Sequence, residues 1–290
     1  MADRVVIFGR AGQLGTELVR LCTERGCVTH AFGRGDVDVT NAAAVEELVI
    51  RHTPTLVYNA TAYNMVDVAE REPEAAFAGN VLAVRNLSMA CRNADAKFVH
   101  FSTDYVFDGE TDRPYSEDDE THPLGAYAVS KLAGELFARA YTPDALIIRT
   151  CGVFGLAGVG TARGNFVETM LRLATRPDPI RVVEDYIASP TYAPELARCA
   201  VDLATLGATG IFHVGGGTPV SWFDFARTIF EEAGLNPELR PTNAREYRTP
   251  ARRPRFSALS NAKMERLGVA PVMPLRDTVR AYMAGRTARQ

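Results

Sequence analysis

Short apolar runs rich in valine and isoleucine alternate, over the first half of the chain, with longer stretches at helical spacing. The runs predict strands at residues 4–9, 28–33, 55–60, 97–102 and 145–150. The stretches between them predict helices at residues 13–25, 41–52, about 74–93 and about 126–141. Because strands alternate with helices, we expect right-handed βαβ units, an α/β fold and a doubly wound parallel sheet.

The pattern loosens beyond residue 150. Residues 156–164 are rich in glycine and alanine and predict a loop, and a helix is expected over 165–175. Residues 242–260 carry prolines and arginines and also predict a loop. We therefore expect one domain over 1–150, with a return segment at about 193–214. A smaller C-terminal lobe would comprise residues 151–192 and 215–290.

Composition narrows the class of protein. A net charge of −3 offers no basic surface for nucleic acid or for an anionic membrane. The apolar runs are far shorter than the roughly 20 residues that a membrane-spanning helix needs. The strand pattern starts within the first residues, which predicts no signal peptide. The five cysteines show no CxxC spacing, so we expect reduced thiols and a cytoplasmic location. The scattered histidines predict no metal site.

Three glycines lie three residues apart between the first predicted strand and the first predicted helix. Gly9, Gly12 and Gly15 would allow a tight turn, a close approach of a pyrophosphate and close packing of helix on strand. The helix N-terminus would then offer free N–H groups to the phosphates. The setting predicts a Rossmann-like dinucleotide site, in which we include Gln13 and Leu14.

Charged residues follow the second predicted strand, where a dinucleotide cofactor is commonly selected. Arg34 can accept a 2′-phosphate, so it favours NADPH, with NADH left open. Asp38 is assigned to the adenine end of the cofactor, together with Val39. The first domain is therefore predicted to bind NADP.

A hydroxyl, a phenol and an amine make up the predicted reducing centre. Thr103 follows a strand, where it could hydrogen-bond a substrate carbonyl, and Tyr127 and Lys131 lie one helical turn apart. Tyrosine has an ordinary pKa near 10, and a nearby ammonium favours its phenolate. We therefore expect Lys131 to lower the pKa of Tyr127, hold the cofactor ribose and support proton donation.

These segments together resemble one family, the dTDP-4-dehydrorhamnose reductases of the extended short-chain dehydrogenase/reductase type. The resemblance covers nearly the whole chain and includes "FGRAGQLG", "NATAYNMVDVAE", "STDYVFDG", "PLGAYAVSKLAGE", "RTCGVFG", "GNFVETMLRLA", "SPTYAPELA" and "TPARRPRFSALS". It implies NADPH-dependent reduction of the 4-keto group of a dTDP-4-dehydro-6-deoxysugar, such as dTDP-4-dehydro-L-rhamnose or a related deoxysugar of specialised metabolism.

The resemblance also implies roles for particular residues. Tyr127 would donate the proton with Lys131 as its partner, and Thr103 would stabilise the transition state. The nicotinamide half of the cofactor would be lined by Thr61, Ala62, Tyr63 and Asn64. The substrate would be contacted by Thr103, Asp104, Gly152, Asn165 and Arg253.

The chain departs from the family in the sugar pocket. Family members carry a tryptophan, as in "RTSWVYG", where this chain has Gly152, and the loss of an indole predicts a larger pocket. Two other readings stay open: a non-catalytic NADP-binding regulatory subunit of the same fold, and a sugar-nucleotide epimerase or dehydratase. Dehydratases carry a glutamate where this chain has Tyr105, which favours simple reduction. The chain is expected to be a monomer or a homodimer.

Overall fold

The computed structural model describes residues 3–161 and 164–288, and its centre is a parallel sheet. The sheet has six strands in the order β2-β1-β3-β4-β5-β8, and every neighbouring pair is parallel. Its strands are β1 (Arg4–Phe8), β2 (Val28–Phe32), β3 (Leu56–Asn59), β4 (Lys97–Thr103), β5 (Leu146–Thr150) and β8 (Gly210–Val214). The α/β fold class and the parallel sheet predicted from the sequence are confirmed.

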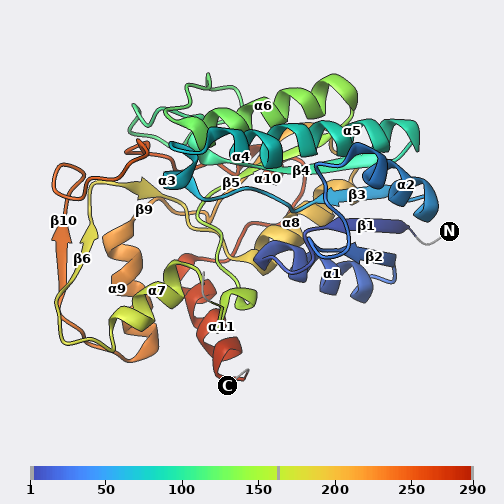
Figure 1. The fold of residues 1–290 in the computed structure, drawn as a ribbon. Coiled ribbons are helices and arrows are strands. Elements are labelled where there is room, and N and C mark those ends of the chain that lie inside the picture. Colours follow the sequence, from blue (N-terminus) through green and yellow to red (C-terminus); the bar gives the residue numbers. More distant parts are fainter. Residues whose placement is uncertain (1–2, 162–163, 289–290) are drawn as a thin grey trace.

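Helices cover both faces of this sheet (Figure 1). One face carries α1 (Gln13–Glu24) and α8 (Ala193–Thr205), which pack against each other. The other face carries α2 (Ala42–His52), α5 (Ala83–Asn93) and α6 (Ala126–Tyr141). Val5 and Ile7 of β1 join the core under α1, whereas Val6 and Phe8 join the core under α5, as the period of two along a strand requires.

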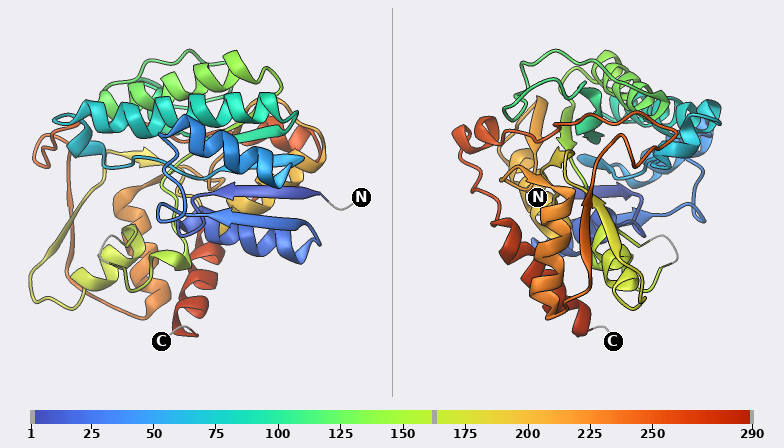
Figure 2. Two further views of the ribbon diagram at one scale, coloured as in Figure 1. Left: turned by 45° about the vertical axis from the view of Figure 1, so that its right-hand side comes forward. Right: turned by 90° about the vertical axis from the view of Figure 1, so that its left-hand side faces the viewer.

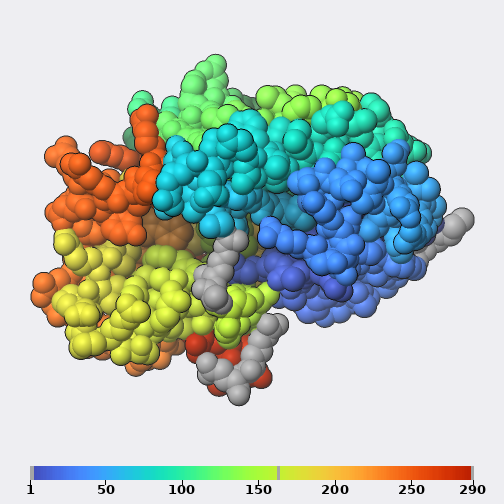
Figure 3. All heavy atoms as spheres, in the orientation of Figure 1, coloured from blue at the N-terminus to red at the C-terminus, as the bar shows by residue number. Residues whose placement is uncertain are grey.

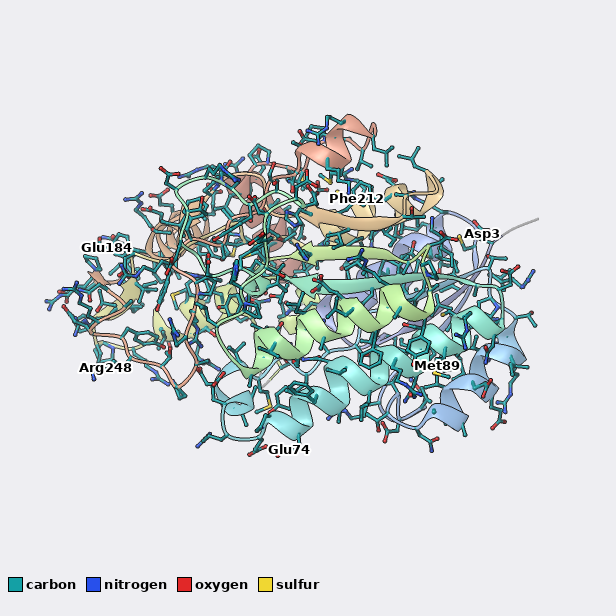
Figure 4. The ribbon with its side chains drawn as sticks, turned by 90° about the horizontal axis from the view of Figure 1, so that it is seen from above. Asp3, Glu74, Met89, Glu184, Phe212 and Arg248 are labelled. Atoms are coloured by element: carbon teal, nitrogen blue, oxygen red, sulfur yellow. The ribbon has the colours of Figure 1, made fainter. Side chains whose placement is uncertain are left out.

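A second group of elements lies beyond the carboxyl ends of the strands and has its own buried core. It contains α7 (Phe166–Leu173), α9 (Trp222–Ala233) and α11 (Leu275–Thr287), with the two-stranded sheets β6 (Ile180–Val183) with β10 (Leu239–Thr242) and β7 (Ile187–Ala188) with β9 (Val220–Ser221). Figure 2 shows α9 and α11 packed together beside the C-terminus. Figure 4 shows Glu184 and Arg248 at the end of the molecule opposite Asp3.

The helix predicted over about 74–93 is interrupted in the structure. It divides into α4 (Pro73–Phe77), a π-helical turn at Ala78–Leu82, and α5. The short helices α3 (Val66–Ala69) and α10 (Ala262–Arg266) were not predicted, nor were the longer helices α8, α9 and α11. The helix predicted over 165–175 is confirmed as α7, and β10 ends where the predicted 242–260 loop begins. Among the described residues, no helix combines the length and apolarity needed to cross a membrane.

Helix α1 approaches β1 so closely that a side chain at Gly15 has no space. A Cβ built on Gly15 would lie 2.0 Å from the carbonyl oxygen of Gly9. Because the obstacle is backbone rather than a movable side chain, the backbones must separate to admit even one carbon.

We expect Gly15→Ala to lower the free energy of unfolding by about 1–2 kcal/mol. The obstacle is backbone, so the overpacking cost lies toward the upper end of about 1–3 kcal/mol, and the gain of about 1 kcal/mol from replacing a helical glycine offsets only part of it. Thermal unfolding measures the change, and Gly35→Ala is the control because nothing lies within 4 Å of its Cβ position. Equal melting temperatures for the two variants would contradict this packing argument.

Candidate active site

A cavity of about 960 Å³ lies at the carboxyl ends of the central strands. From β1 the chain continues to β2 on one side of β1 and then to β3 on the other side. Open parallel sheets bind ligands at such switch points in the strand order. Figure 3 shows this face hollowed between the cyan atoms and the yellow-green atoms. The predicted site residues that line the cavity are Gly9, Gly12, Gln13, Leu14, Arg34, Asp38, Val39, Thr61, Ala62, Tyr63, Asn64, Thr103, Tyr127, Lys131 and Gly152.

The glycine turn leaves the beginning of α1 open to this cavity. Gly9 has φ +93°, and its Cβ would lie 2.6 Å from the carbonyl oxygen of Ala60, so only glycine fits without strain. Gly12 is the N-cap residue of α1, and no side chain caps the helix there. The first N–H groups of α1 are therefore free of side-chain acceptors, as an anion site at a helix N-terminus requires. Gly15 packs against the strand and does not line the cavity.

The turn after β2 contains two acidic residues with different partners and an arginine at the cavity wall. Asp36 forms an ion pair with Arg10 at 3.1 Å. Asp38 accepts hydrogen bonds from the backbone and hydroxyl of Thr40 at 2.9 and 2.8 Å, which lower its pKa. Arg34 is exposed, lines the cavity and also lowers the pKa of Asp38 by its charge. The turn thus presents a cation, Arg34, at the cavity wall.

The segment after β3 is held by a buried asparagine that the sequence analysis did not single out. Asn59 accepts hydrogen bonds from the backbone and the hydroxyl of Thr61, at 3.1 and 2.6 Å. Its amide nitrogen also contacts Nδ1 of buried His100 at 3.2 Å. Asn59 is fully buried, and its hydrogen bonds to Thr61 hold the backbone of the predicted nicotinamide segment in place.

The π-helical turn supplies a second asparagine to the same segment. The side chain of Asn80 accepts from the backbone N–H of Tyr63 and donates to the Tyr63 carbonyl, both at 2.9 Å. It also donates to the hydroxyl of Ser130 on α6 at 3.0 Å. π-Helical turns often occur at functional sites. This one was not predicted, because residues 74–93 have the sequence pattern of a continuous helix.

Tyr127 lies in the first turn of α6, and a distant carboxylate anchors that turn. Glu70 accepts a hydrogen bond from the backbone N–H of Ala126 at 2.8 Å. A Cβ on Gly125 would lie 2.5 Å from the same carboxylate oxygen, so the glycine leaves room for this contact. The loop that contains α3 and the start of α6 are therefore tied together beside the cavity.

Burial raises the pKa of Tyr127 to about 12, and the charge of nearby Asp104 acts in the same direction. A hydrogen bond with the side chain of Thr103 lowers it, but less strongly. The net shift is upward, so the lowered pKa that we expected for Tyr127 is wrong for the structure described. The reason is that loss of solvent around the phenol outweighs every favourable interaction with its charged form.

Lys131 is buried, and its Nζ donates to the carbonyl oxygen of Phe101 at 2.6 Å. Burial lowers the pKa of this amine to about 8, and the charge of Glu135 opposes the shift only in part. The amine lines the same cavity as Tyr127 and Thr103, so the structure brings the three predicted catalytic residues to one wall.

Three predicted substrate residues do not line the cavity. Asp104 is buried, and its pKa is raised by burial against the opposing effect of Ser257. Arg253 pairs with the carboxylate of Asp67 at 2.8 Å. Asn165 is the N-cap residue of α7, where its side chain accepts from the backbone N–H of Glu168 at 3.0 Å.

A hydrogen-bond network joins the glycine turn to the second group of elements. The side-chain oxygen of Gln13 accepts from the backbone N–H of Gly155 at 2.7 Å and from the amide of Asn165 at 2.8 Å. The Asn165 amide also contacts the hydroxyl of Tyr282 on α11 at 3.2 Å. The residue that follows Gly12 therefore connects α1 with α7 and α11.

The wall near Gly152 differs from the larger pocket expected from the sequence. A Cβ built on Gly152 would lie 3.1 Å from Cη2 of Trp222, which begins α9. The space beside Gly152 is thus already occupied by an indole from elsewhere in the chain. Trp222 is the only tryptophan in the sequence, and no local motif predicts that it lies beside Gly152.

The family model described as "RmlD substrate binding domain" matches residues 3–287. The chain belongs to this family. It is 37% identical to the dTDP-4-dehydrorhamnose reductase of Mycobacterium tuberculosis, over 98% of this chain and 93% of that protein. It is 35% identical to the dTDP-4-keto-6-deoxy-D-glucose reductase of Streptomyces niveus, over 94% and 93% of the two chains.

Solved structures agree with the sequence relatives. The crystal structure of dTDP-4-dehydrorhamnose reductase from Bacillus anthracis in complex with NADP superposes with a TM-score of 0.93 at 31% identity, covering 98% of this chain and 100% of that one. The predicted family and the Rossmann-like fold are confirmed, and this structural relative binds the predicted cofactor, NADP. The individual site residues stay predictions.

The depressed pKa of Lys131 has a measurable consequence for stability. Its native pKa of about 8 lies below its usual 10.5, so between these values the unfolded chain binds more protons than the native one. The free energy of unfolding therefore gains a contribution from Lys131 as the pH rises through this window. The full change is on the order of 3 kcal/mol.

We expect the difference in free energy of unfolding between the wild-type protein and Lys131→Met to rise in favour of the wild type from pH 8 to pH 10.5. Urea unfolding under reducing conditions at several pH values measures it. Losses that do not depend on pH, such as the hydrogen bond to Phe101, cancel in the slope. A difference that stays constant across the window would show that the native amine titrates normally.

Proposed function

We propose that this protein reduces the 4-keto group of a dTDP-4-dehydro-6-deoxysugar with NADPH. The product is dTDP-L-rhamnose or a related deoxysugar nucleotide. The observation that carries the proposal is the convergence of Tyr127, Thr103 and Lys131 on one wall of a dinucleotide-sized cavity. The relatives named for reduction of a dTDP-4-keto sugar support it.

The cavity suits NADPH on structural grounds. The side-chain-free turn at Gly9 and Gly12 leaves space for a pyrophosphate at the open N-terminus of α1. Arg34 would pair with a 2′-phosphate, and Asp38 with Val39 would lie at the adenine end. The segment from Thr61 to Asn64, together with Lys131, would line the nicotinamide half. NADH is the alternative cofactor in this proposal.

Buried hydroxyls in the wall support the fit. The hydroxyls of Ser102 and Thr150 both lie at the cavity and have no hydrogen-bond partner among the described residues. Buried polar groups of this kind are normally satisfied, so they would bond polar groups of the bound cofactor or substrate. No comparable partner is available to them within the described protein.

The chemistry assigned to the chain is proton donation and charge stabilisation. NADPH, when bound, supplies the hydride to the carbonyl carbon. Tyr127 donates its hydroxyl proton to the carbonyl oxygen, while Thr103 hydrogen-bonds that oxygen as charge develops. A pKa of about 12 keeps the phenol protonated at neutral pH, as a proton donor requires. Lys131, with a pKa of about 8, is mostly charged at that pH and stabilises the resulting phenolate.

The substrate side of the proposal includes Gly152, which lines the cavity, and three residues that do not line it. Asp104 adjoins Thr103 at the reacting end, Gly152 borders the sugar, and Asn165 with Arg253 would lie toward the nucleotide. We propose that residues 1–150, with the return segment at about 193–214, hold NADP. The lobe of residues 151–192 and 215–290 would hold the sugar nucleotide, consistent with its separate hydrophobic core.

Three further properties belong to the proposal. The cysteines are free in the structure, in keeping with a cytoplasmic location. The protein would act as a monomer or a homodimer on a dTDP-sugar, without nucleic acid or membrane. No metal is assigned, and the described residues contain no cluster of histidine, cysteine or carboxylate side chains placed to hold one.

An NADPH-oxidation assay against a small panel of dTDP-4-keto sugars tests the proposed function. The expected result is oxidation of NADPH that depends on one or more of these sugars, with an equal amount of reduced product. If the protein binds NADPH but oxidises none with any member of the panel, the regulatory-subunit reading replaces the reductase.

We expect Tyr127→Phe to retain NADPH binding but to lose at least about 10²-fold in kcat, because general acid catalysis contributes on that scale. Steady-state kinetics with the best substrate measures the loss. Tyr141→Phe removes a hydroxyl from the other end of α6 and serves as the control. Turnover close to wild type in Tyr127→Phe would remove this tyrosine from the mechanism.

We expect Arg34→Ala to weaken NADPH binding about 10- to 100-fold, the loss of a hydrogen bond to a charged group, and to leave NADH nearly unchanged. Titration with each cofactor measures the two affinities. Arg51→Ala, an exposed arginine paired with Glu47 on α2, is the control. Equal losses for both cofactors would show that Arg34 does not recognise the 2′-phosphate.

A further inference from the structure

The only tryptophan of the chain lies directly against a side-chain-free position of the cavity wall. Trp222 begins α9, and its Cη2 lies 3.1 Å from the position that a Cβ on Gly152 would take. The Cα of Pro190 bounds the same position at 3.5 Å. The first carbon of any side chain at residue 152 would therefore make a tight contact with the indole, and one of the two would have to shift slightly.

The backbone at Gly152 independently favours glycine. Its φ is +49°, a left-handed conformation that other residues adopt only at a cost. Gly152 lines the cavity together with Thr150 and Val153, in the wall that also contains Thr103 and Tyr127. The absence of a side chain at this position thus leaves room for the indole against Gly152, a residue of the cavity wall, although Trp222 is not itself among the residues that line the cavity.

Neighbouring groups hold the indole in one orientation. The Phe166 ring packs edge-on at 4.7 Å between centroids, and Phe225 lies at 6.0 Å. The backbone N–H of Trp222 donates to the carbonyl of Tyr186 at 3.2 Å, and Ser221 caps the helix that Trp222 begins. The side chain nevertheless stays partly exposed. A rigid, partly exposed aromatic ring binds a ligand with little loss of conformational entropy.

We propose that Trp222 is the residue that recognises the hexose ring of the substrate and so determines sugar specificity. The indole would pack against the C–H face of the sugar while the 4-keto oxygen lies at Tyr127 and Thr103. The inference rests on the proposed function, because it takes the substrate to be a dTDP-hexose. dTDP ends at its pyrophosphate and lacks the hexose, so dTDP alone does not make this contact.

Binding measurements separate recognition of the sugar from a structural role. We expect Trp222→Ala to weaken binding of dTDP-L-rhamnose about tenfold, while affinities for dTDP and NADPH change by less than about twofold. Trp222→Phe should restore most of the loss because it keeps an aromatic face. Equal weakening of dTDP and dTDP-L-rhamnose, or no weakening of either, would overturn the proposal.

The wild-type protein gives a readout that does not depend on any variant folding. With one tryptophan in the chain, its fluorescence reports on Trp222 alone. We expect dTDP-L-rhamnose to change the intensity or the emission maximum, and dTDP to leave both nearly unchanged. The same response to both ligands would contradict the contact with the sugar.

A double-mutant cycle tests whether Gly152 and Trp222 act as a pair. Gly152→Ala strains the backbone in every background, so this cost cancels between the wild type and Trp222→Phe. We expect Gly152→Ala to reduce dTDP-L-rhamnose affinity more when Trp222 is present, because the new carbon then meets the indole. Equal reductions in both backgrounds would overturn the pairing.

The two proposals fail in different ways. A wild-type protein that binds dTDP-L-rhamnose through Trp222 but reduces no dTDP-4-keto sugar refutes the proposed function and leaves Trp222 as the sugar contact. A wild-type protein that reduces the sugar, with KM and kcat unchanged in Trp222→Ala, refutes the role of Trp222 and leaves the proposed function intact.

Discussion

The approach of α1 to β1 through Gly15 and Gly9 controls the geometry of the whole site. With no Cβ at Gly15, the helix begins beside the strand and directs its N–H groups into the cavity. The same approach brings Gln13 to Gly155 and Asn165, so the second group of elements is fixed to the first turn of α1. One contact between backbones thus helps to position both the glycine turn at the cavity and the second group of elements.

Burial then sets the protonation of the reacting groups. Burial raises the pKa of Tyr127 to about 12 and lowers that of Lys131 to about 8. A phenol that stays protonated suits a reaction that consumes a proton. The charged amine of Lys131 can stabilise the phenolate that forms when Tyr127 gives up its proton. The two opposite shifts have one cause, which is the low polarity of the site.

The strands β1 to β5 and the helices α1, α2, α6 and α7 could be predicted because each depends on a local pattern. Val5 to Phe8 alternate between two cores, and the three glycines carry their conformational meaning in their spacing. The π-helical turn could not be predicted, because it allows Asn80 to accept a hydrogen bond from the backbone of Tyr63, which lies in a separate segment. Two other features could not be predicted either: the position of the Trp222 indole beside Gly152, and the hydrogen bond from the Lys131 amine to the carbonyl of Phe101. Contacts between distant segments decide all three.

A crystal structure of the complex with NADP and dTDP-L-rhamnose tests the central claim most directly. The account predicts that the hydroxyl of Tyr127 lies roughly 2.6–3.2 Å from the sugar O4, with the nicotinamide against the same carbon and Thr103 bonded to the same oxygen. A complex in which the Tyr127 hydroxyl points away from both the sugar and the nicotinamide would contradict it.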